Sequence, residues 1–315
     1  NKHLLLRQET LALTKVNDFL DRIARNSEKS KETYASALSY FQTFLSNHDP
    51  YTSDTLDNII DKLMGKEIDV YTILDNFVSY MSKLSPSTIT LYISAVKSYL
   101  QYYDIEISSS KFKRRVKLPK NHKVKEVAID ANDIRKILKS CNNTRIKSVL
   151  YVLASSGVRI TECLAIRNKD IDFSVTPTRI RVRAEIAKTR TERYVYISNE
   201  ATQFLKEWLD WKYRDRKDKK RIPPKLPDDI VFSGNTFVRN PQKPHSLYIK
   251  VLQYFHRILK VLNMDERKEN MLRHKITIHS FRRFVYTTIC NAVNQGFAEE
   301  YLGHSGSVYH TMKEA

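Results

Sequence analysis

The sequence predicts a mainly helical fold with one small antiparallel β-sheet, an α+β arrangement in two domains. Apolar residues recur at helical spacing through the first third of the chain, and a strict alternation of apolar and charged residues occurs near residue 180. A basic segment without periodicity separates the two parts. The chain has 315 residues, 41% of them hydrophobic, which is enough apolar material for two cores without disulfides or metals.

The first domain, residues 1–107, is expected to be a bundle of about five short helices. Ser85 and Pro86 form a favourable N-cap and first-turn pair, and apolar residues follow from Ile89 to Tyr103 at helical spacing. Similar stripes begin at Ala12 and Tyr34. One face of each of these helices is therefore expected to be buried.

Residues 108–125 are interpreted as an interdomain linker. From Lys111 to Lys125 this segment has eight Lys and Arg residues and no acidic residue. One interpretation is a solvated charge run, and the other is a strand of positive charge that follows a phosphate backbone. The second interpretation assigns nucleic-acid contacts to Lys111, Lys113, Arg114, Arg115 and Lys117.

The second domain, residues 126–315, is expected to begin with a helix capped by Asp130, with Asp133 three residues later. An apolar helix over 149–154 leads to Gly157. The alternation over 179–186 and again over 193–197 predicts two strands joined by a turn at 187–192. Helical periodicity resumes at 198, a polar stretch at 214–244 predicts a long surface loop, and helices return from 247.

Composition limits the function classes. Lys and Arg outnumber Asp and Glu by 54 to 35, a net charge of +19, and the commonest partner of such a field is nucleic acid. A ribosome-associated or merely basic protein is the alternative. No apolar run is long enough to span a membrane, no cysteine spacing fits a zinc site, and no glycine-rich phosphate loop occurs. We therefore expect a cytoplasmic, nucleoid-associated protein without a metal or cofactor.

Three separated segments combine glycines or helix boundaries with charged residues that packing does not require. Arg159 directly follows the Gly157 turn, His279 and Arg282 are spaced i, i+3, and His304 lies between Gly303 and Gly306.

These segments resemble the tyrosine recombinase (integrase) family. SSGVRITECLAIRNKDID from Ser155 is similar to the family's first arginine box, HSFRRFVYTTI from His279 to its His-x-x-Arg box, and YLGHSG from Tyr301 to its Leu-Gly-His box. The hairpin residue Lys188 stands where the family has a catalytic lysine. The resemblance covers roughly residues 126–310 in the family's order, and it implies a helical core-binding domain before a catalytic domain.

The chemistry explains why these residue types are needed. Attack on a phosphodiester builds negative charge on its oxygens, and the planar forks of Arg159 and Arg282 suit that charge. His279 is the candidate for accepting the nucleophile's proton, Lys188 for protonating the leaving 5′-hydroxyl, and His304 for hydrogen bonding the phosphate. Arg190 and Arg193 are assigned at most phosphate contacts.

The nucleophile departs from the family pattern. In the family, the nucleophilic tyrosine usually follows the last histidine by about nine residues. Nine residues after His304 this chain has Lys313, and Tyr309 follows His304 by only five. We assign Tyr309, because a four-residue shortening is close to one helical turn. The competing Tyr301 has the apolar context of a packed core residue. Arg283 stands where many members have a second histidine.

The expected function is site-specific DNA recombination through a covalent 3′-phosphotyrosyl intermediate, without a metal, in the service of a mobile genetic element. The expected partner is double-stranded DNA with a specific site, bound by a tetramer when two sites synapse and by a monomer or dimer otherwise. The alternatives are a type IB-like topoisomerase and a catalytically decayed DNA-binding regulator on the same fold.

Overall fold

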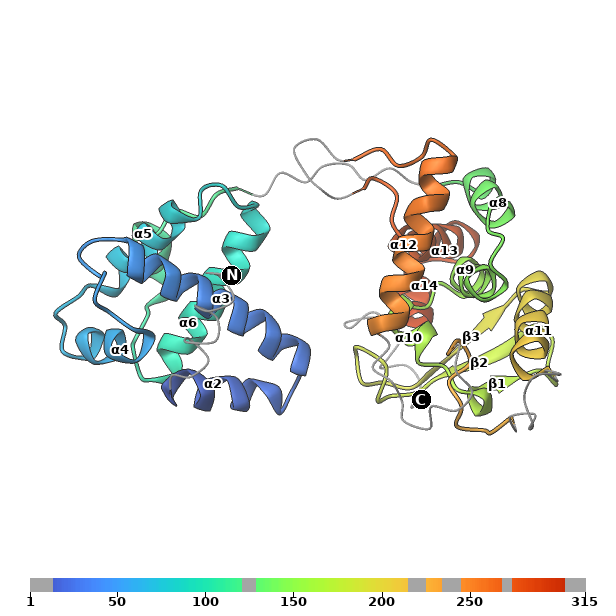
Figure 1. Ribbon diagram of the computed structural model, residues 1–315, viewed down its shortest axis with the longest axis horizontal. Coiled ribbons are helices and arrows are strands. Elements are labelled where there is room, and N and C mark those ends of the chain that lie inside the picture. The colour runs from blue at the N-terminus through green and yellow to red at the C-terminus, as the bar shows by residue number, and fades with distance from the viewer. Residues whose placement is uncertain (1–13, 121–128, 215–224, 234–244, 268–273, 304–315) are drawn as a thin grey trace. The chain divides into compact units, whose positions relative to one another are not determined.

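A computed structural model of the chain describes residues 14–120, 129–214, 225–233, 245–267 and 274–303. Over these residues the fold is helical apart from one three-stranded antiparallel sheet, which confirms the predicted fold class. The chain divides into two compact units, Asn1–Val124 and Lys125–Ala315 (Figure 1). Each unit has its own hydrophobic core.

The first unit is a helical bundle. Five helices precede residue 107 in the part that the structure describes, as the periodicity predicts: α2 (Thr14–Ala24), α3 (Glu28–Asn47), α4 (Leu56–Met64), α5 (Val70–Tyr80) and α6 (Pro86–Tyr102). Four of them begin with a side chain that accepts a hydrogen bond from the third helical N–H: Ser27, Thr55, Asp69 and Ser85. Each such cap stabilises its helix by about 1 kcal/mol.

Aromatic side chains fill the core of this bundle. The ring of Phe77 lies 4.8 Å from that of Phe41 and 5.4 Å from that of Phe44, which joins α5 to α3. The buried Tyr99 of α6 donates its hydroxyl proton to the carbonyl oxygen of Leu56 at 2.9 Å. This bond satisfies a polar group that would otherwise be costly to bury.

The predicted linker begins later in the chain than its composition indicated. Residues Ser109–Arg115 form a helix, α7, whose Phe112 is 8% exposed and packs in the core of the first unit. Arg115 forms an ion pair with Asp69, 2.8 Å between nitrogen and oxygen, and lies over the ring of Tyr71. A single buried phenylalanine in a run of basic residues was too weak a signal for helical periodicity.

The second unit surrounds α9. Its described elements are α8 (Ala131–Lys139), α9 (Thr144–Ser156), α10 (Ile160–Leu164), the 3-10 turn η1 (Asn168–Asp170), β1 (Ile171–Asp172), β2 (Thr178–Val182), β3 (Arg193–Ile197), α11 (Asn199–Tyr213), α12 (His245–Val261), α13 (His279–Ala292) and α14 (Gln295–Leu302). The predicted capping pair is confirmed, because Asp130 and Asp133 form a reciprocal capping box at the start of α8.

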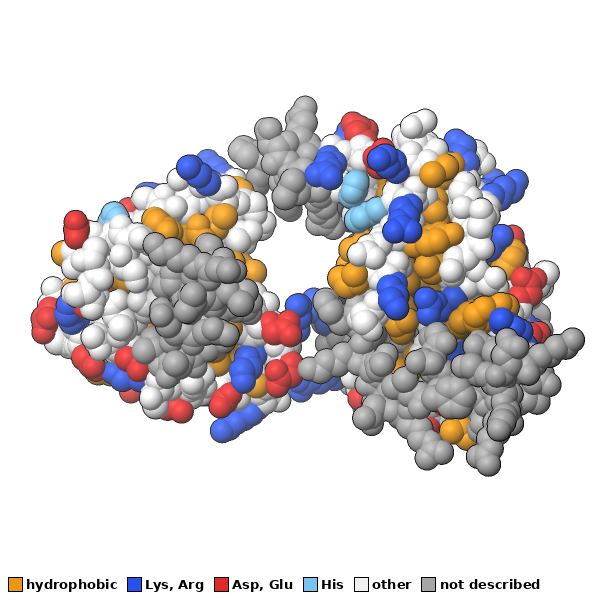
Figure 2. All heavy atoms as spheres, viewed as in Figure 1, with side chains coloured by type: hydrophobic (Ala, Val, Ile, Leu, Met, Phe, Trp, Pro, Cys, Tyr) orange, Lys and Arg blue, Asp and Glu red, His pale blue; other side chains and the backbone are white. Residues whose placement is uncertain are grey.

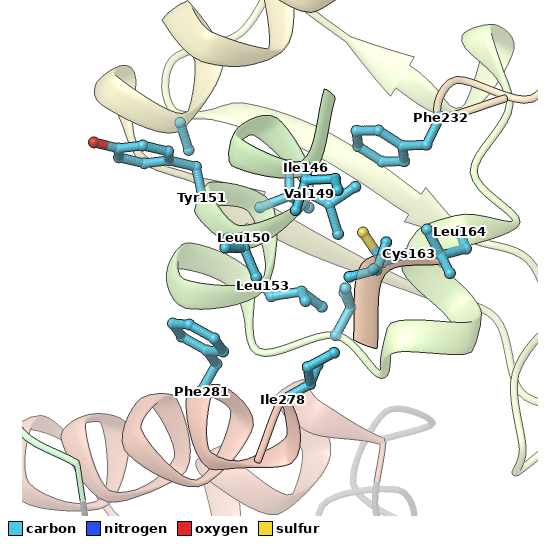
Figure 3. Close-up of a cluster of buried hydrophobic side chains, with 14 of the residues drawn as sticks. Ile146, Val149, Leu150, Tyr151, Leu153, Cys163, Leu164, Phe232, Ile278 and Phe281 are labelled. Atoms are coloured by element: carbon cyan, nitrogen blue, oxygen red, sulfur yellow. The ribbon is translucent and has the colours of Figure 1, made fainter. Parts of the chain in front are cut away.

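Helix α9 lies between α11 and α13 and is buried on nearly every side (Figure 1). Figure 3 shows Val149 and Leu153 of α9 among side chains from α10, from α13 and from the segment after α11, including Cys163, Phe281 and Phe232. Each fully buried apolar side chain of this size contributes about 1.5–3 kcal/mol. Both ends of α9 are therefore held in fixed positions.

The sheet has the strand order β1-β2-β3, with Ile180 of β2 opposite Ile171 and Val195. The strand predicted over 179–186 ends at Val182 instead. The next side chain, Arg183, turns inward: its Nε donates to the buried carboxylate of Asp170 at 3.0 Å, and Nη2 donates to the carbonyl of Ala165. Residues 183–192 therefore connect β2 to β3 as a longer loop than the predicted turn.

Part of the predicted surface loop at 214–244 is buried. Val231 and Phe232 are 0% and 1% exposed. Trp208 Nε1 donates to the carbonyl oxygen of Val231 at 2.8 Å, and the buried Lys212 Nζ donates to that of Ile230 at 2.5 Å. Two donors on α11 thus hold this segment in the core.

Candidate active site

Gly157 positions the first predicted arginine. It ends α9 in the left-handed conformation with φ +66°, as the glycine turn predicted. Arg159 follows as the N-cap residue of α10, and its side chain is 20% exposed. The backbone turn thus presents a half-buried guanidinium at the surface of the second unit.

Gly157 also permits a close approach between helices. A Cβ atom at this position would lie 2.7 Å from Leu302 Cδ2 and 3.0 Å from Val285 Cβ. A side chain fits there only if the side chains of Leu302 on α14 and Val285 on α13 give way. The end of α9 is therefore in direct contact with both later helices.

Arg282 lies in the first turns of α13 and is only 4% exposed. Its Nη1 donates to the carbonyl oxygen of Gly157 at 2.8 Å, and Nη2 donates to that of Leu302 at 2.5 Å. Burial, with the nearby charge of Arg159, lowers the pKa of Arg282 to about 10. The guanidinium remains a cation at neutral pH.

The two predicted arginines converge on the same backbone. Arg159 Nη2 donates to the carbonyl oxygen of Gly303 at 3.3 Å, one residue beyond the acceptor used by Arg282. His304, the predicted phosphate ligand, comes next in the chain. His304 and Tyr309 lie outside the described residues.

Glu162 was not predicted as a site residue, yet it organises the arginines. Its carboxylate is 1% exposed and accepts hydrogen bonds from the backbone N–H of Arg159, from Arg159 Nη1 at 3.0 Å and from Arg193 Nη2 at 2.6 Å. Burial acts to raise the pKa of Glu162, but the hydrogen bonds and charges of the two arginines outweigh it and hold that pKa below its usual value. The carboxylate is therefore ionised and fixes both guanidinium groups.

Arg193, the first residue of β3, reaches into the site from the sheet. Its side chain is 10% exposed, and Gly303 packs on it so closely that a Cβ there would lie 3.0 Å from Nη1. Its Nε is buried and has no hydrogen-bond partner within the described residues. The alternation of β3 places Arg193 on the same face as the buried Val195 and Ile197, whereas Arg181 of β2 lies between buried residues and is exposed. This alternation was the signal in the sequence for the inward position of Arg193.

A pocket of about 530 Å³ opens beside these residues. Arg159, Arg282 and His279 line it, and His279, the exposed first residue of α13, lies at its edge. Figure 2 shows basic and histidine side chains gathered over α12 on this face of the second unit. The first and second predicted segments thus meet at one pocket, which brings together the three predicted site residues Arg159, His279 and Arg282.

Two further histidines that the sequence did not single out line the same pocket. The rings of His256 on α12 and His274 lie 4.4 Å apart, and Nδ1 of His274 is 2.9 Å from the carbonyl oxygen of Asp265. Burial, with the proximity of His274, lowers the pKa of His256. His256 stands between Phe255 and Arg257 and His274 between Arg273 and Lys275, and a lone histidine in either setting forms no recognisable motif.

The remaining predicted residues that the structure describes are not among those that line the pocket. Lys188 is exposed in the loop between β2 and β3 and is not among the residues that line the pocket. Arg190, in the same loop, is exposed and has a φ of 55°. In the basic segment Lys111, Lys113, Arg114 and Lys117 are exposed on the first unit, whereas Arg115 is paired with Asp69.

Tyr301, the competing tyrosine, is part of the packing. Its hydroxyl accepts a hydrogen bond from the backbone N–H of Tyr196 at 3.0 Å and donates to the carbonyl oxygen of the same residue at 3.3 Å. Burial raises the pKa of Tyr301. The phenol joins α14 to β3 and is poorly suited to become a phenolate.

The described residues include no cluster of three or more His, Cys, Asp or Glu side chains arranged to hold a metal ion. Over the same residues, no helix combines the length and the apolar character needed to span a bilayer.

A model of the phage integrase family matches residues 128–313. Tyrosine recombinase XerA of Saccharolobus solfataricus is 28% identical over 186 residues, and the match covers 58% of this chain and 58% of that relative's length. A tyrosine recombinase of Thermosipho africanus is 23% identical over 303 residues, 92% of this chain and 89% of its own.

The fold is also similar to that of a solved structure. The crystal structure of the XerH site-specific recombinase bound to palindromic difH substrate, a post-cleavage complex, superposes with a TM-score of 0.59 at 19% identity, over 98% of this chain and 88% of that one. Because the family match covers more than half of the chain and includes both arginine segments, this protein belongs to the phage integrase family, the tyrosine recombinases.

Proposed function

We propose that the protein is a site-specific DNA recombinase that cuts and rejoins strands through a 3′-phosphotyrosyl intermediate. The observation that carries this proposal is the convergence of Arg159 and Arg282. They are 123 residues apart (282 − 159), yet they line one pocket and donate to consecutive carbonyls, those of Leu302 and Gly303.

The pocket is suited to an anion with several oxygens. Within the described residues, two of the five N–H groups of Arg282 donate to carbonyl oxygens, and we assign the other N–H groups to the anion. These fixed donors suit the charge that develops on the non-bridging phosphate oxygens during attack, and they need no reorganisation at that moment.

In the proposed step one phosphorus–oxygen bond forms and another breaks, and one proton is transferred at each of the two oxygens involved. The Tyr309 oxygen attacks the phosphorus and gives its proton to His279, while the bond from phosphorus to the 5′ oxygen breaks. Lys188 gives a proton to that leaving oxygen, and His304 hydrogen-bonds the phosphate. The reverse sequence with a new 5′-hydroxyl rejoins the strand and frees the tyrosine.

The proposed ligand is double-stranded DNA with a specific site. The XerH structure holds its difH substrate, and the net charge of +19 here favours the same class of partner. We assign the helical unit, residues 1–107, and the basic segment at 108–125 to DNA binding, and residues 126–315 to catalysis, with a tetramer acting on two synapsed sites.

A plasmid assay tests this function. The substrate is a supercoiled plasmid with two directly repeated copies of the DNA that flanks the gene, and the control plasmid has one copy. Recombination predicts two smaller circles from the first plasmid only. Relaxed topoisomers from both plasmids would instead indicate a type IB-like topoisomerase, and a mobility shift without products would indicate a DNA-binding regulator.

A further inference from the structure

A second pocket lies at the other end of α9, and it contains both tryptophans of the chain. Its volume is about 330 Å³, and it is lined by Asn142, Asn143, Thr144, Arg145, Trp208 and Trp211. We call it the tryptophan pocket. At 1.5 Å per helical residue, α9 separates Arg145 from Gly157 by about 18 Å, so this pocket is distinct from the one that holds the two arginines.

The cationic and aromatic side chains of the tryptophan pocket form a stack. The guanidinium of Arg145 lies 6.0 Å from the Trp208 ring, the two indole rings are stacked at 5.3 Å, and the guanidinium of Arg214 lies 3.9 Å from the Trp211 ring. Trp208 is buried, and Nε1 is bound to Val231. Trp211 packs on Trp208 and lies under Arg214, but 43% of it is still exposed at the surface.

Arg145 is the unexplained residue of this stack. It is half-buried, and burial lowers its pKa, yet within the described residues it has no hydrogen bond and no ion pair, only its contact with Trp208. A guanidinium with five donors beside two asparagines is complementary to a carboxylate.

We propose that the tryptophan pocket is a docking site for an acidic peptide segment of a partner protein. A Glu or Asp carboxylate pairs with Arg145, and a neighbouring apolar side chain of the peptide packs on Trp211. Trp and Arg are the residue types that dominate binding energy at protein interfaces, and the chain's net charge of +19 attracts an acidic partner over long range. Duplex DNA fits this pocket poorly, because a small aromatic pocket with one arginine cannot follow a row of phosphates.

Peptide binding to the full chain tests the proposal. The probe is a fluorescein-labelled peptide of alternating leucine and glutamate, five residues long, and its partner peptide has glutamine in place of glutamate. Binding is followed by anisotropy and by the emission of the two tryptophans. We expect the glutamate peptide to bind at least tenfold more tightly than the glutamine peptide and to change the tryptophan emission.

Three variants locate the binding. Arg145→Gln and Trp211→Ala should each weaken binding of the glutamate peptide about tenfold, whereas Arg135→Gln, which removes an equal charge from exposed α8, should change it less than twofold. Arg145→Lys keeps the charge and should give an intermediate loss even if the glutamine variant folds poorly. Superimposable thermal melts confirm that the variants compared are folded.

Three outcomes would overturn the proposal. They are no binding of the glutamate peptide, an equal loss in Arg145→Gln and Arg135→Gln, and displacement of the peptide by oligothymidylate whose own binding depends on Arg145. The last result would assign the pocket to single-stranded nucleic acid. Because none of these measurements uses strand cleavage, they are independent of the proposed recombinase activity.

Discussion

Arg282 donates a hydrogen bond from Nη1 to the carbonyl oxygen of Gly157 over 2.8 Å, and so connects α13 to the turn that ends α9. Through Nη2 the same side chain is bound to Leu302 at the end of α14. One buried cation therefore holds together the three chain segments that supply the site. Its structural role and its proposed role toward phosphate use different N–H groups of the same guanidinium.

Arg159→Lys should separate binding from catalysis. Lysine keeps the positive charge but loses the fork that donates to Glu162 and to an anion at once. We expect strand cleavage to fall by about 10²-fold or more while DNA affinity changes little. Single-turnover cleavage and a gel-shift titration on the same DNA measure the two quantities. Parallel losses would show that Arg159 is only a phosphate anchor.

Glu162→Gln should destabilise the second unit. The substitution leaves Arg159 and Arg193 beside a neutral amide in a buried position, a change that typically costs about 3–5 kcal/mol. Glu192→Gln is the matched control, because it removes a carboxylate from an exposed pair with Arg181 and should cost less than about 1 kcal/mol. Urea unfolding measures the loss of unfolding free energy in each variant. Equal losses would contradict the role of Glu162 as the buried partner of Arg159 and Arg193.

The contribution of Glu162 should depend on pH in a defined direction. Its pKa is lowered in the folded protein, so the stabilisation is fully present above the unfolded-state value of about 4.3 and is lost as the pH falls through the lower folded-state value. The difference in unfolding free energy between wild type and Glu162→Gln should be constant at neutral pH and narrow in acid. A difference that grows on acidification would mean that the folded carboxyl is protonated first.

Gly157→Ala should disrupt the contact between α9 and the two C-terminal helices. The left-handed φ and the 2.7 Å approach to Leu302 together predict a loss of about 2–4 kcal/mol. Gly65→Ala is the control, since a Cβ there meets no atom closer than 3.4 Å and the backbone is right-handed. Thermal unfolding compares them, and a Gly157→Ala protein as stable as Gly65→Ala would refute the packing argument.

The basic segment should contribute to the salt dependence of DNA binding. Replacing Lys113, Arg114 and Lys117 by glutamine should reduce the slope of log affinity against log salt by about 0.9 for each phosphate that the variant no longer neutralises. Arg115 is kept, because its pair with Asp69 stabilises the first unit. A control triple of Arg25, Lys29 and Lys83 removes the same charge elsewhere. An unchanged slope in the first triple would show that this segment does not touch DNA.

The sequence predicted those features that depend on neighbouring residues. The αL turn at Gly157, the capping box at Asp130 and the position of Arg159 at a helix start all follow from patterns a few residues long. The ion pair of Arg193 with Glu162 could not be predicted, because the two residues are 31 positions apart (193 − 162) and their contact depends on how the sheet packs against α10.

The dependence on contacts between distant residues also explains why the predicted end of β2 and the predicted start of the linker were wrong. Arg183 continues the alternating pattern of β2 perfectly, but its long side chain finds a buried partner in Asp170, and the strand ends there. Phe112 lies in a run of basic residues with the composition of a solvated segment, yet Phe112 and the following Val116 are both buried in the first core and hold α7 on that unit. In both cases the tertiary contacts of one or two side chains decide the backbone.

The central claim is that a tyrosine of this chain becomes covalently joined to DNA, and trapping that adduct tests it most directly. A substrate nicked next to the cleavage site releases a short strand on attack, so religation cannot occur and the protein stays attached. We expect wild type and Tyr301→Phe to give an adduct visible by denaturing electrophoresis, and Tyr309→Phe to give none. An adduct of equal yield in Tyr309→Phe would contradict the assignment of the nucleophile, and no adduct from wild type on a site that it binds would contradict the proposed chemistry itself.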